Sequence, residues 1–331
     1  MATRPHVPSK GIWAPAITFF DRETDTLDLP NQKKYFKYLS ETGLTGLVIL
    51  GTNAGKSPIP SQSLPLTPHT EAFLLSQEER KTLITAAREA VGPDFPLMAG
   101  VGAHSTSQVL AHIDDAASAG ADYVLVLPPA YFGAATTPAV IKSFFSSVSA
   151  HSKLPIIIYN FPGVCNGVDM SSELIADIAN ANDNVVGVKL TCGSVGKITR
   201  LSGQFTPERF STFGGQSDFL LGGLMAGSAG CIAAFANVAP KTVVKIYELY
   251  KAGEAEKALK LHQNAALCEG VTRQSIGATK FAAAIRSAEA AGIEKASDKL
   301  LPRKPYEAPT FLVKALVIEA VEALEKFEAD L

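Results

Sequence analysis

The sequence predicts an α/β fold of the (β/α)8, or TIM-barrel, class with a C-terminal extension of three helices. Short and nearly continuous apolar runs alternate with amphipathic helical stretches along most of the chain. Such runs are typical of parallel strands that are covered on both faces, and their alternation with helices is typical of α/β folds. A chain of 331 residues is long enough for one large barrel.

Eight apolar runs are the candidate strands. They begin at Gly11, Thr45, Pro96, Asp122, Pro155, Val185, Arg209 and Gly230. The helical patterns between them span about residues 31–42, 77–91, 106–119, 138–150, 171–181, 194–202, 217–226 and 240–252. Eight strand–helix pairs predict a barrel over residues 10–253. Residues 254–331 contain only helical patterns, which predict three further helices.

Composition excludes several function classes. Lysine and arginine residues are scattered, and the net charge is −2, so we expect no nucleic-acid partner. The N-terminal sequence lacks the apolar core of a secretory signal, and the four cysteines lie far apart, which favours a cytoplasmic protein with reduced thiols. The uncharged stretch 219–240 imitates a membrane span. Its glycines favour a short helix, a turn and a buried strand instead, so we expect no membrane partner.

Lys189 is the leading candidate for a catalytic residue. It lies in VVGVKLTCG, near the end of a predicted strand, and active sites of (β/α)8 barrels lie at the C-terminal ends of strands. Burial lowers the pKa of an amine, and half-neutrality at pH 7 needs a fall of about three units, or roughly 4 kcal/mol. A neutral lysine attacks carbonyl carbons and forms a Schiff base. The alternative is a lysine that reaches solvent or pairs with an acid.

Tyr159 ends the preceding predicted strand, so we expect it to lie beside Lys189. A phenol at that position could move protons during carbinolamine formation and carbon–carbon cleavage. Thr52 and Tyr131 follow other predicted strands and could relay that proton. The alternative for each is an ordinary packing role. The histidines form no H-x-H or H-E-x-x-H pair, so we expect no metal.

Together these features resemble the dihydrodipicolinate synthase/N-acetylneuraminate lyase family of class I aldolases. The resemblance runs from about Gly11 to the C-terminal helices. Its motifs, in chain order, are GTN, LSQEER, AGVGAHST, PPAYF, YNFPG, GVKLT and FANV. Each motif is weak alone, but their combined order is a strong signal.

The resemblance implies roles for individual residues. Lys189 would form the Schiff base with the keto carbon of pyruvate or of a pyruvate-derived substrate. Tyr159 would be the acid/base, hydrogen-bonded to Thr52 and, across a subunit contact, to Tyr131. The remaining substrate-binding candidates are Thr52, Asn53, Gly215, Ile232 and Thr191. The family is usually a homotetramer of two tight dimers and uses no metal or organic cofactor, only the covalent Schiff base.

One departure from the family concerns the aldehyde substrate. Dihydrodipicolinate synthase has an arginine four or five residues past the catalytic tyrosine, whereas this chain has Gly163, Val164 and Cys165 there. A carboxylate-bearing aldehyde would lose a charge-assisted pair. The motifs YNFPGV and KLTCGSVGKITR look most like a fungal branch that includes L-threo-3-deoxy-hexulosonate aldolases.

We therefore predict cleavage of a 2-keto-3-deoxy sugar acid into pyruvate and a glyceraldehyde-type aldehyde. The alternatives within the family are 4-hydroxy-2-oxoglutarate aldolase and a dihydrodipicolinate synthase-type activity. The alternative of another class is a catalytically silent homologue that binds 2-oxo acids.

Two glycine-containing stretches imitate nucleotide-binding loops. In GTNAGKS, only three residues separate Gly51 from Gly55, one fewer than a phosphate-binding loop needs, and prolines follow where a helix should begin. GVGAHS has Ser105 where a dinucleotide-binding fingerprint has its third glycine. A turn with Ser105 or Thr106 as the helix N-cap explains it as well.

Residues 55–70 are the second departure from the family. Removing these sixteen residues leaves GTNAEAFLLSQEER, which restores the family pattern except for Ala54. The codons of Gly55-Lys56-Ser57 can contain the splice donor GTAAGT, and those of Thr70-Glu71 an ACAG acceptor. We interpret the segment as a retained intron, and the alternative is a genuine surface insertion.

Overall fold

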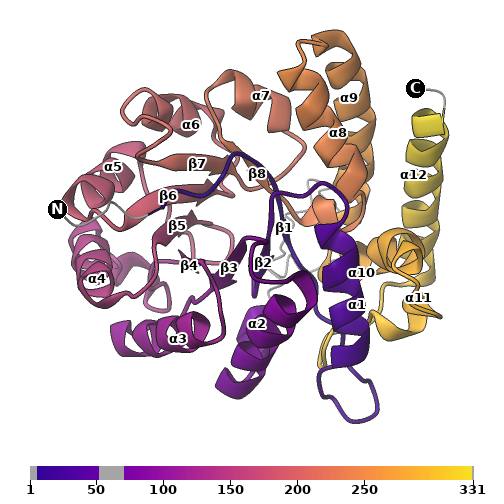
Figure 1. The fold of residues 1–331 in the computed structure, drawn as a ribbon, viewed down its shortest axis with the longest axis horizontal. Helices are drawn as coiled ribbons and strands as arrows, with labels where there is room; N and C mark the ends of the chain where they lie inside the picture. The colour runs from indigo at the N-terminus through magenta and orange to yellow at the C-terminus, as the bar shows by residue number, and fades with distance from the viewer. Residues whose placement is uncertain (1–5, 52–70, 330–331) are drawn as a thin grey trace.

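Eight short parallel strands pair in chain order, and β8 pairs with β1 to close the barrel (Figure 1). This computed structural model describes residues 6–51 and 71–329. It confirms the predicted TIM barrel with C-terminal helices. The strands are β1 Gly11–Pro15, β2 Gly46–Ile49, β3 Leu97–Gly100, β4 Tyr123–Val126, β5 Ile156–Asn160, β6 Val185–Leu190, β7 Ser211–Gly214 and β8 Gly230–Ile232.

Strand register decides which side chains share the barrel interior. Tyr159 on β5 pairs with Lys189 on β6, and Lys189 pairs with Phe213 on β7. Side chains of laterally paired residues point to the same face of a sheet. Tyr159 and Phe213 belong to the interior cluster, so Lys189 also points inward. The other strand residues of that cluster are Trp13, Val48, Met98, Tyr123, Leu125, Ile157, Val186 and Ile232.

The outer ring of helices covers the strands and buries a second, larger apolar cluster. Its long helices are α1 Leu29–Ser40, α2 Gln77–Val91, α3 Thr106–Ser118, α4 Pro138–His151, α5 Ser172–Ala181, α6 Val195–Ser202, α7 Leu220–Met225 and α8 Pro240–Lys251. Short 3-10 turns precede α2, α4 and α8, at Glu71–Leu74, Gly133–Ala135 and Ala234–Asn237.

Polar N-caps fix where most of these helices begin. The caps that accept a backbone hydrogen bond are Asp28, Ser76, Ser105, Thr137, Ser171 and Ser194. Ser76 and Glu79 form a complete capping box, which explains the LSQEER motif. Ser105 caps α3, which confirms the turn interpretation of GVGAHS.

The stretch that imitates a membrane span is divided among several elements. It forms α7, the short strand β8 and the 3-10 turn before α8, as the glycine content predicts. No helix in residues 6–51 and 71–329 is long and apolar enough to cross a membrane.

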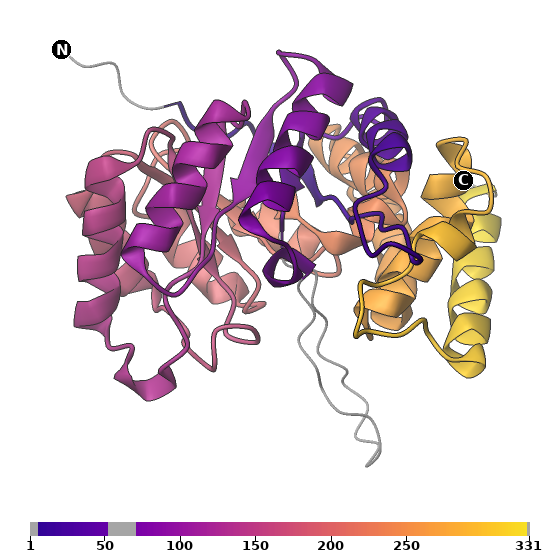
Figure 2. The same ribbon diagram turned by 90° about the horizontal axis from the view of Figure 1, so that it is seen from below.

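The C-terminal helices form a layer beside the barrel, next to α8 and α1 (Figures 1 and 2). They are α9 Ala255–Thr272, α10 Ile276–Ala283, the short α11 Ala296–Lys299 and α12 Phe311–Ala329. Three of the four correspond to the predicted helices. The sequence did not predict that α10 continues into a π-helical turn over Ala284–Ala288, nor the short α11.

A buried ion pair joins this layer to the barrel. The ammonium of Lys280 on α10 lies 2.6 Å from Glu71, and the Lys280 side chain is fully buried. Arg303, in the segment before α12, pairs with Glu79 at 2.8 Å. Breaking a buried pair by removing one partner is strongly destabilising, so these contacts hold the segment after residue 70 against the C-terminal layer.

Candidate active site

Lys189 lies near the C-terminal end of β6, in the barrel interior. It is 1% exposed. Its amine nitrogen lies 4.4 Å from the centre of the Tyr159 ring on the neighbouring strand. The predicted juxtaposition of these two residues is therefore present, and it follows directly from strand pairing.

Burial lowers the pKa of Lys189 to about 7, and the nearby Cys231 offsets this only in part. The amine is therefore partly neutral at physiological pH, as the sequence argument requires. A neutral amine in buried, apolar surroundings is a nucleophile toward carbonyl compounds. The alternative of a lysine that reaches solvent does not fit its burial.

Tyr159 is 2% exposed and packs against Phe161 with ring centres 5.7 Å apart. Tyr159 also lines a cavity of about 10 Å³ at the ends of β3 and β4, together with Gly100, Gly102 and Leu127. The Tyr159 side chain thus contacts both the amine of Lys189 and this cavity.

Thr191 follows Lys189 by two residues, and its backbone N–H donates to the carbonyl of Asn160. Its hydroxyl is buried and has no hydrogen-bond partner among the described residues. A buried hydroxyl without a partner costs free energy, so a polar group that enters here would be stabilised.

Gly215 packs directly against Thr191. A Cβ atom at this position would lie 2.1 Å from the Thr191 hydroxyl oxygen and 2.6 Å from its Cα, so only glycine fits. Ile232, on β8, is fully buried in the interior cluster. Both candidates therefore lie in the barrel, Gly215 beside the end of β6 and Ile232 on the opposite side of β7.

Two side chains on α9 hold the β7–α7 loop that contains Gly215. The Ser217 N–H donates to Glu269 at 3.2 Å, and the Ser217 hydroxyl donates to the second Glu269 oxygen. His262 contacts the Ser217 carbonyl at 2.7 Å. Next to them, Arg273 pairs with Asp218.

Burial, and then the charge of Asp218, raise the pKa of Glu269 to about 7. Burial also lowers the pKa of His262. Sequence reasoning missed both residues. In the sequence, the signal for Glu269 was the position of a glutamate beside the apolar face of a predicted helix.

The loop after Tyr159 carries a polar network in place of the family arginine. Asn160 donates to Asp169 at 2.7 Å, and Asp169 pairs with Lys197 of α6 at 2.5 Å. Lys197 is mostly buried. Lys197 therefore brings an ammonium group to this loop from a different element, and Asp169 balances its charge.

Tyr131 lies on the β4–α4 segment and is 73% exposed. Its ring contacts among the described residues are with His104 and Phe132, with ring centres 5.8 and 5.3 Å away. Phe73 stacks on His104 from the other side. The structure describes a single chain, so the hydrogen bond of Tyr131 to Tyr159 across a subunit contact stays a prediction.

Thr52 and Asn53, predicted to hold the pyruvyl carboxylate, lie outside the described residues, and so does the insertion 55–70. Within the described parts of the chain, no three histidine, cysteine, aspartate or glutamate residues are arranged to hold a metal ion.

The model of the dihydrodipicolinate synthetase family matches residues 8–308. The chain belongs to this family. It is a class I, pyruvate-dependent lyase of the aldolase type, which confirms the enzyme class that Lys189 and the motif order predict.

Three fungal relatives bear on the substrate. A Coccidioides immitis protein with the provisional name of a mitochondrial 4-hydroxy-2-oxoglutarate aldolase is 63% identical over 327 residues, 99% of each chain. An Emericella nidulans protein with the same kind of provisional name is 36% identical over 335 residues, covering 100% of this chain and 99% of that one. An L-threo-3-deoxy-hexylosonate aldolase of Hypocrea jecorina is 36% identical over 292 residues, 84% of this chain and 86% of its own.

Solved structures share the fold. A family protein from Coccidioides immitis has a TM-score of 0.89 and 60% identity, covering 99% of this chain and all of its own. The Escherichia coli protein YagE, solved in complex with pyruvate, has a TM-score of 0.79 and 24% identity, covering 96% of this chain and 98% of its own.

These comparisons correct one prediction. The two full-length relatives are both named mitochondrial, which contradicts the cytoplasmic location expected from the sequence. The reason is that the lack of a secretory signal and of paired cysteines excludes secretion only, and it does not separate the cytosol from the mitochondrion.

Proposed function

We propose that the chain is a 4-hydroxy-2-oxoglutarate aldolase that uses Lys189 as its Schiff-base residue. The observation that carries the catalytic part is the buried Lys189 amine, with its pKa lowered to about 7, beside the Tyr159 ring. The substrate part is supported by the name of a relative that is 63% identical over its whole length.

The proposed reaction begins when the neutral Lys189 amine attacks the keto carbon of the substrate. Loss of water from the carbinolamine gives an iminium ion, which withdraws electrons from the adjacent carbon. Tyr159 then removes the proton of the C4 hydroxyl, the C3–C4 bond breaks, and glyoxylate leaves. The enamine that remains takes up a proton at C3, and hydrolysis of the imine releases pyruvate and restores the amine.

Two features of the described residues support a substrate with a second carboxylate. The partnerless hydroxyl of Thr191 lies two residues beyond Lys189 and can donate to an anionic oxygen. Lys197 brings an ammonium group, paired with Asp169, to the loop after Tyr159, so a cation is present on this loop although residues 163–165 are uncharged. The sugar-acid prediction relied on the absence of an arginine there and on the likeness of YNFPGV and KLTCGSVGKITR to a fungal branch of the family.

The second candidate is an L-threo-3-deoxy-hexulosonate aldolase. It is favoured by the uncharged residues at 163–165 and by the name of the Hypocrea jecorina relative. An uncharged aldehyde product needs no cationic partner. This candidate is the sugar-acid activity that the sequence predicts, and the 63% identical relative favours the first candidate over it.

A retro-aldol assay with both substrates separates these candidates, with lactate dehydrogenase and NADH reporting pyruvate. We expect kcat/KM for 4-hydroxy-2-oxoglutarate to exceed that for the sugar acid by at least about tenfold, the effect of one charge-assisted hydrogen bond. The reverse preference would establish the second candidate. No pyruvate from either substrate would contradict both.

Thr191→Val is the accompanying variant, because valine has the shape of threonine without the hydroxyl. We expect it to lower kcat/KM about tenfold for 4-hydroxy-2-oxoglutarate. Thr199→Val is the matched control on exposed α6 surface, and it should behave like the unsubstituted enzyme.

We further propose that the active form is an assembly of identical chains, as the family resemblance implies. The exposed aromatic rings of Phe73, Tyr131 and Phe132 favour contact with a second copy. Phe132→Asp should weaken association in sedimentation and lower activity in parallel. A fully active monomer would remove the proposed role of Tyr131.

A further inference from the structure

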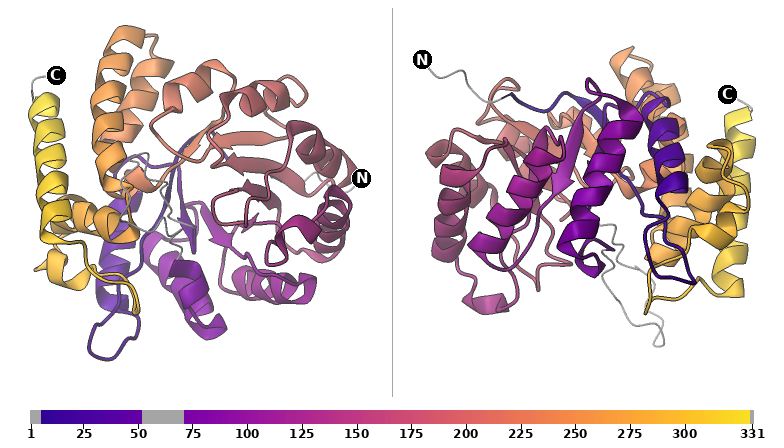
Figure 3. Two further views of the ribbon diagram at one scale, coloured as in Figure 1. Left: turned by 180° about the vertical axis from the view of Figure 1, so that it is seen from behind. Right: turned by 60° about the horizontal axis from the view of Figure 1, so that its bottom comes forward.

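A basic cavity of the described residues lies between α8, α9, Arg286 and the end of α12. Its volume is about 600 Å³. Its lining residues are Lys241, Thr242, Lys245, Leu249, Glu254, Lys257, Leu261, Arg286 and Glu328. We refer to it as the α8–α9 cavity. Figure 3 shows α8 at one side of the molecule, beside the helices of the C-terminal layer.

The lining is cationic in a chain whose net charge is −2. Four of the lining residues are lysine or arginine and two are glutamate. Both glutamates are already occupied, since Glu254 pairs with Lys257 at 2.5 Å and Glu328 pairs with Arg286. Lys241 and Lys245 have no ion-pair partner within the described parts of the chain, so the cavity has an excess of positive charge.

Lys241 and Lys245 stand one turn apart on the same face of α8, and both are exposed. Like charges at this spacing repel each other and destabilise a helix. An anion between them would convert that repulsion into two attractions. Lysine is a common ligand of anionic oxygens for this reason.

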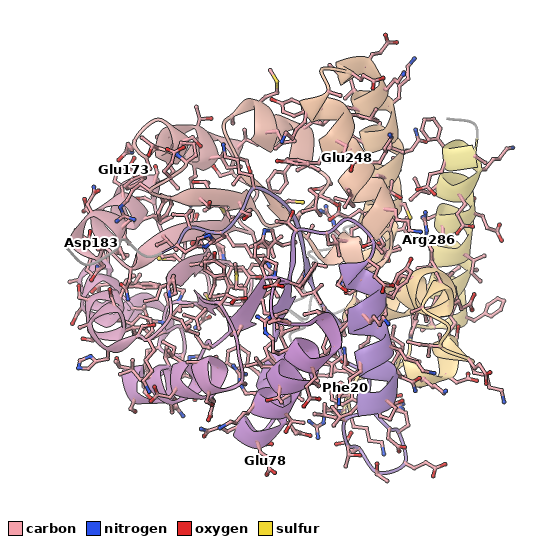
Figure 4. The ribbon with its side chains drawn as sticks, viewed as in Figure 1. Phe20, Glu78, Glu173, Asp183, Glu248 and Arg286 are labelled. Atoms are coloured by element: carbon pink, nitrogen blue, oxygen red, sulfur yellow. The ribbon has the colours of Figure 1, made fainter. Side chains whose placement is uncertain are left out.

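Arg286 supplies an independent observation on the cavity wall. Its side chain is 17% exposed, and Figure 4 places it between the α8–α9 pair and α12. Its Nε lies 3.7 Å from Glu325 and one terminal nitrogen donates to Glu328. The other terminal nitrogen, Nη1, is buried and has no hydrogen-bond partner among the described residues. A buried guanidinium N–H without an acceptor is costly, and an anionic oxygen would satisfy it.

The backbone at Arg286 is also unusual. It lies in the π-helical turn Ala284–Ala288, and such turns are rare and occur frequently at functional sites. The next residue, Ser287, hydrogen-bonds the carbonyl of Asn237, and Asn237 in turn donates to the carbonyl of Pro15 at the end of β1. The turn is therefore anchored to the barrel, which fixes the position of the guanidinium.

The lining also contains buried apolar residues. Leu249 and Leu261 are buried, and Thr242 uses its hydroxyl to donate to Glu328. A ligand would thus meet exposed lysines, the Arg286 N–H and a small apolar surface, beside two glutamates that are already paired. This lining suits a compact molecule with two or more anionic groups.

We propose that the α8–α9 cavity is a binding site for a small polyanion, either a phosphate ester or a polycarboxylate, that is separate from the active site. Lys241 and Lys245 bind the anionic groups from α8, and Arg286 Nη1 donates to one of them from the wall. The proposal does not depend on the substrate of the aldolase.

Isothermal titration with pyrophosphate and with citrate tests this, at constant ionic strength set with sodium chloride. We expect at least one of the two to bind with a 1:1 stoichiometry, and the preferred one identifies the anion class. Lys241→Gln/Lys245→Gln should weaken that binding at least about tenfold. Lys34→Gln/Lys37→Gln removes two exposed lysines of α1 and should leave it unchanged.

A Lys189→Met variant separates this site from the barrel mouth. The same Kd in that variant supports the α8–α9 cavity, whereas lost binding would show that the anion occupies the active site. The proposal is overturned if neither anion binds at millimolar concentration. It is also overturned if the Lys241/Lys245 variant binds as tightly as the unsubstituted chain.

Discussion

The amine nitrogen of Lys189 lies 4.4 Å from the centre of the Tyr159 ring, and both side chains are buried. Because adjacent parallel strands carry them in register, neither residue can move away without disturbing the barrel. The proposed nucleophile and the proposed proton-transfer group are therefore held side by side by two paired strands of the barrel. Burial gives the amine the lowered pKa that a Schiff-base lysine needs.

The pH dependence of imine formation should report that pKa. The pKa of Lys189 is lowered to about 7, so the reactive neutral fraction grows as the pH rises through that value. With sub-saturating pyruvate, we expect the trapping rate to increase about tenfold between pH 6 and pH 8 and then to level off. A lysine with an ordinary pKa would give a trapping rate that still increases above pH 9. That result would contradict the lowered pKa of the buried Lys189 amine.

Tyr159→Phe should keep the fold and lose turnover. Phenylalanine fills the same volume, so the interior stays packed, but the proton-transfer group is gone. We expect kcat to fall about 10²- to 10⁴-fold while pyruvate can still be trapped on Lys189. Tyr123→Phe is the matched control, because Tyr123 is also in the barrel interior but begins β4 at the opposite end. Equal effects of the two substitutions would argue against a catalytic tyrosine.

Glu269→Gln should change how stability depends on pH. The pKa of Glu269 is raised in the folded protein to about 7, so its stabilising contribution is fully present below the unfolded pKa and is lost as the pH rises through about 7. Relative to the variant, the free energy of unfolding of the unsubstituted protein should fall by about 1.4 kcal/mol per pH unit between the ordinary glutamate pKa of 4.5 and about pH 7. Urea unfolding at pH 5, 6 and 7 measures this.

Glu248 is exposed, so Glu248→Gln is the control for the unfolding series. Its free energy of unfolding should change with pH in the same way as that of the unsubstituted protein. The same Glu269 variant should raise KM, because the carboxylate holds both Ser217 donors of the loop that contains Gly215. A pH-independent stability difference together with an unchanged KM would show that Glu269 neither titrates near pH 7 nor positions the loop.

Removing residues 55–70 tests the retained-intron interpretation at the protein level. The deletion joins Ala54 to Glu71 and restores the family spacing, so we expect a folded enzyme with activity equal to or above that of the 331-residue chain. Replacing the segment with sixteen Gly/Ser residues controls for length. Transcripts that read continuously through the segment, with no spliced form, would instead establish a genuine insertion.

The sequence was sufficient for the barrel and for the central pair of residues. Apolar runs mark strands because both faces of each strand are covered, and the positions of Tyr159 and Lys189 at consecutive strand ends make them neighbours in any (β/α)8 barrel. The N-cap at Ser105 was equally readable, since capping depends on a few adjacent residues.

Contacts between distant segments could not be read in this way. The Ser217–Glu269 bonds join residues 52 positions apart, and the Lys280–Glu71 pair joins residues 209 positions apart. Nothing local in the sequence marks these partners. For a related reason, the sequence did not reveal that Lys197, on another helix, brings an ammonium group to the loop after Tyr159, where it pairs with Asp169.

Mass spectrometry after borohydride reduction in the presence of pyruvate tests the central claim most directly. The account predicts a single added pyruvyl group on the peptide that contains Lys189, and no addition in Lys189→Met. Failure to trap pyruvate on the folded enzyme, or trapping on any other lysine, would contradict it.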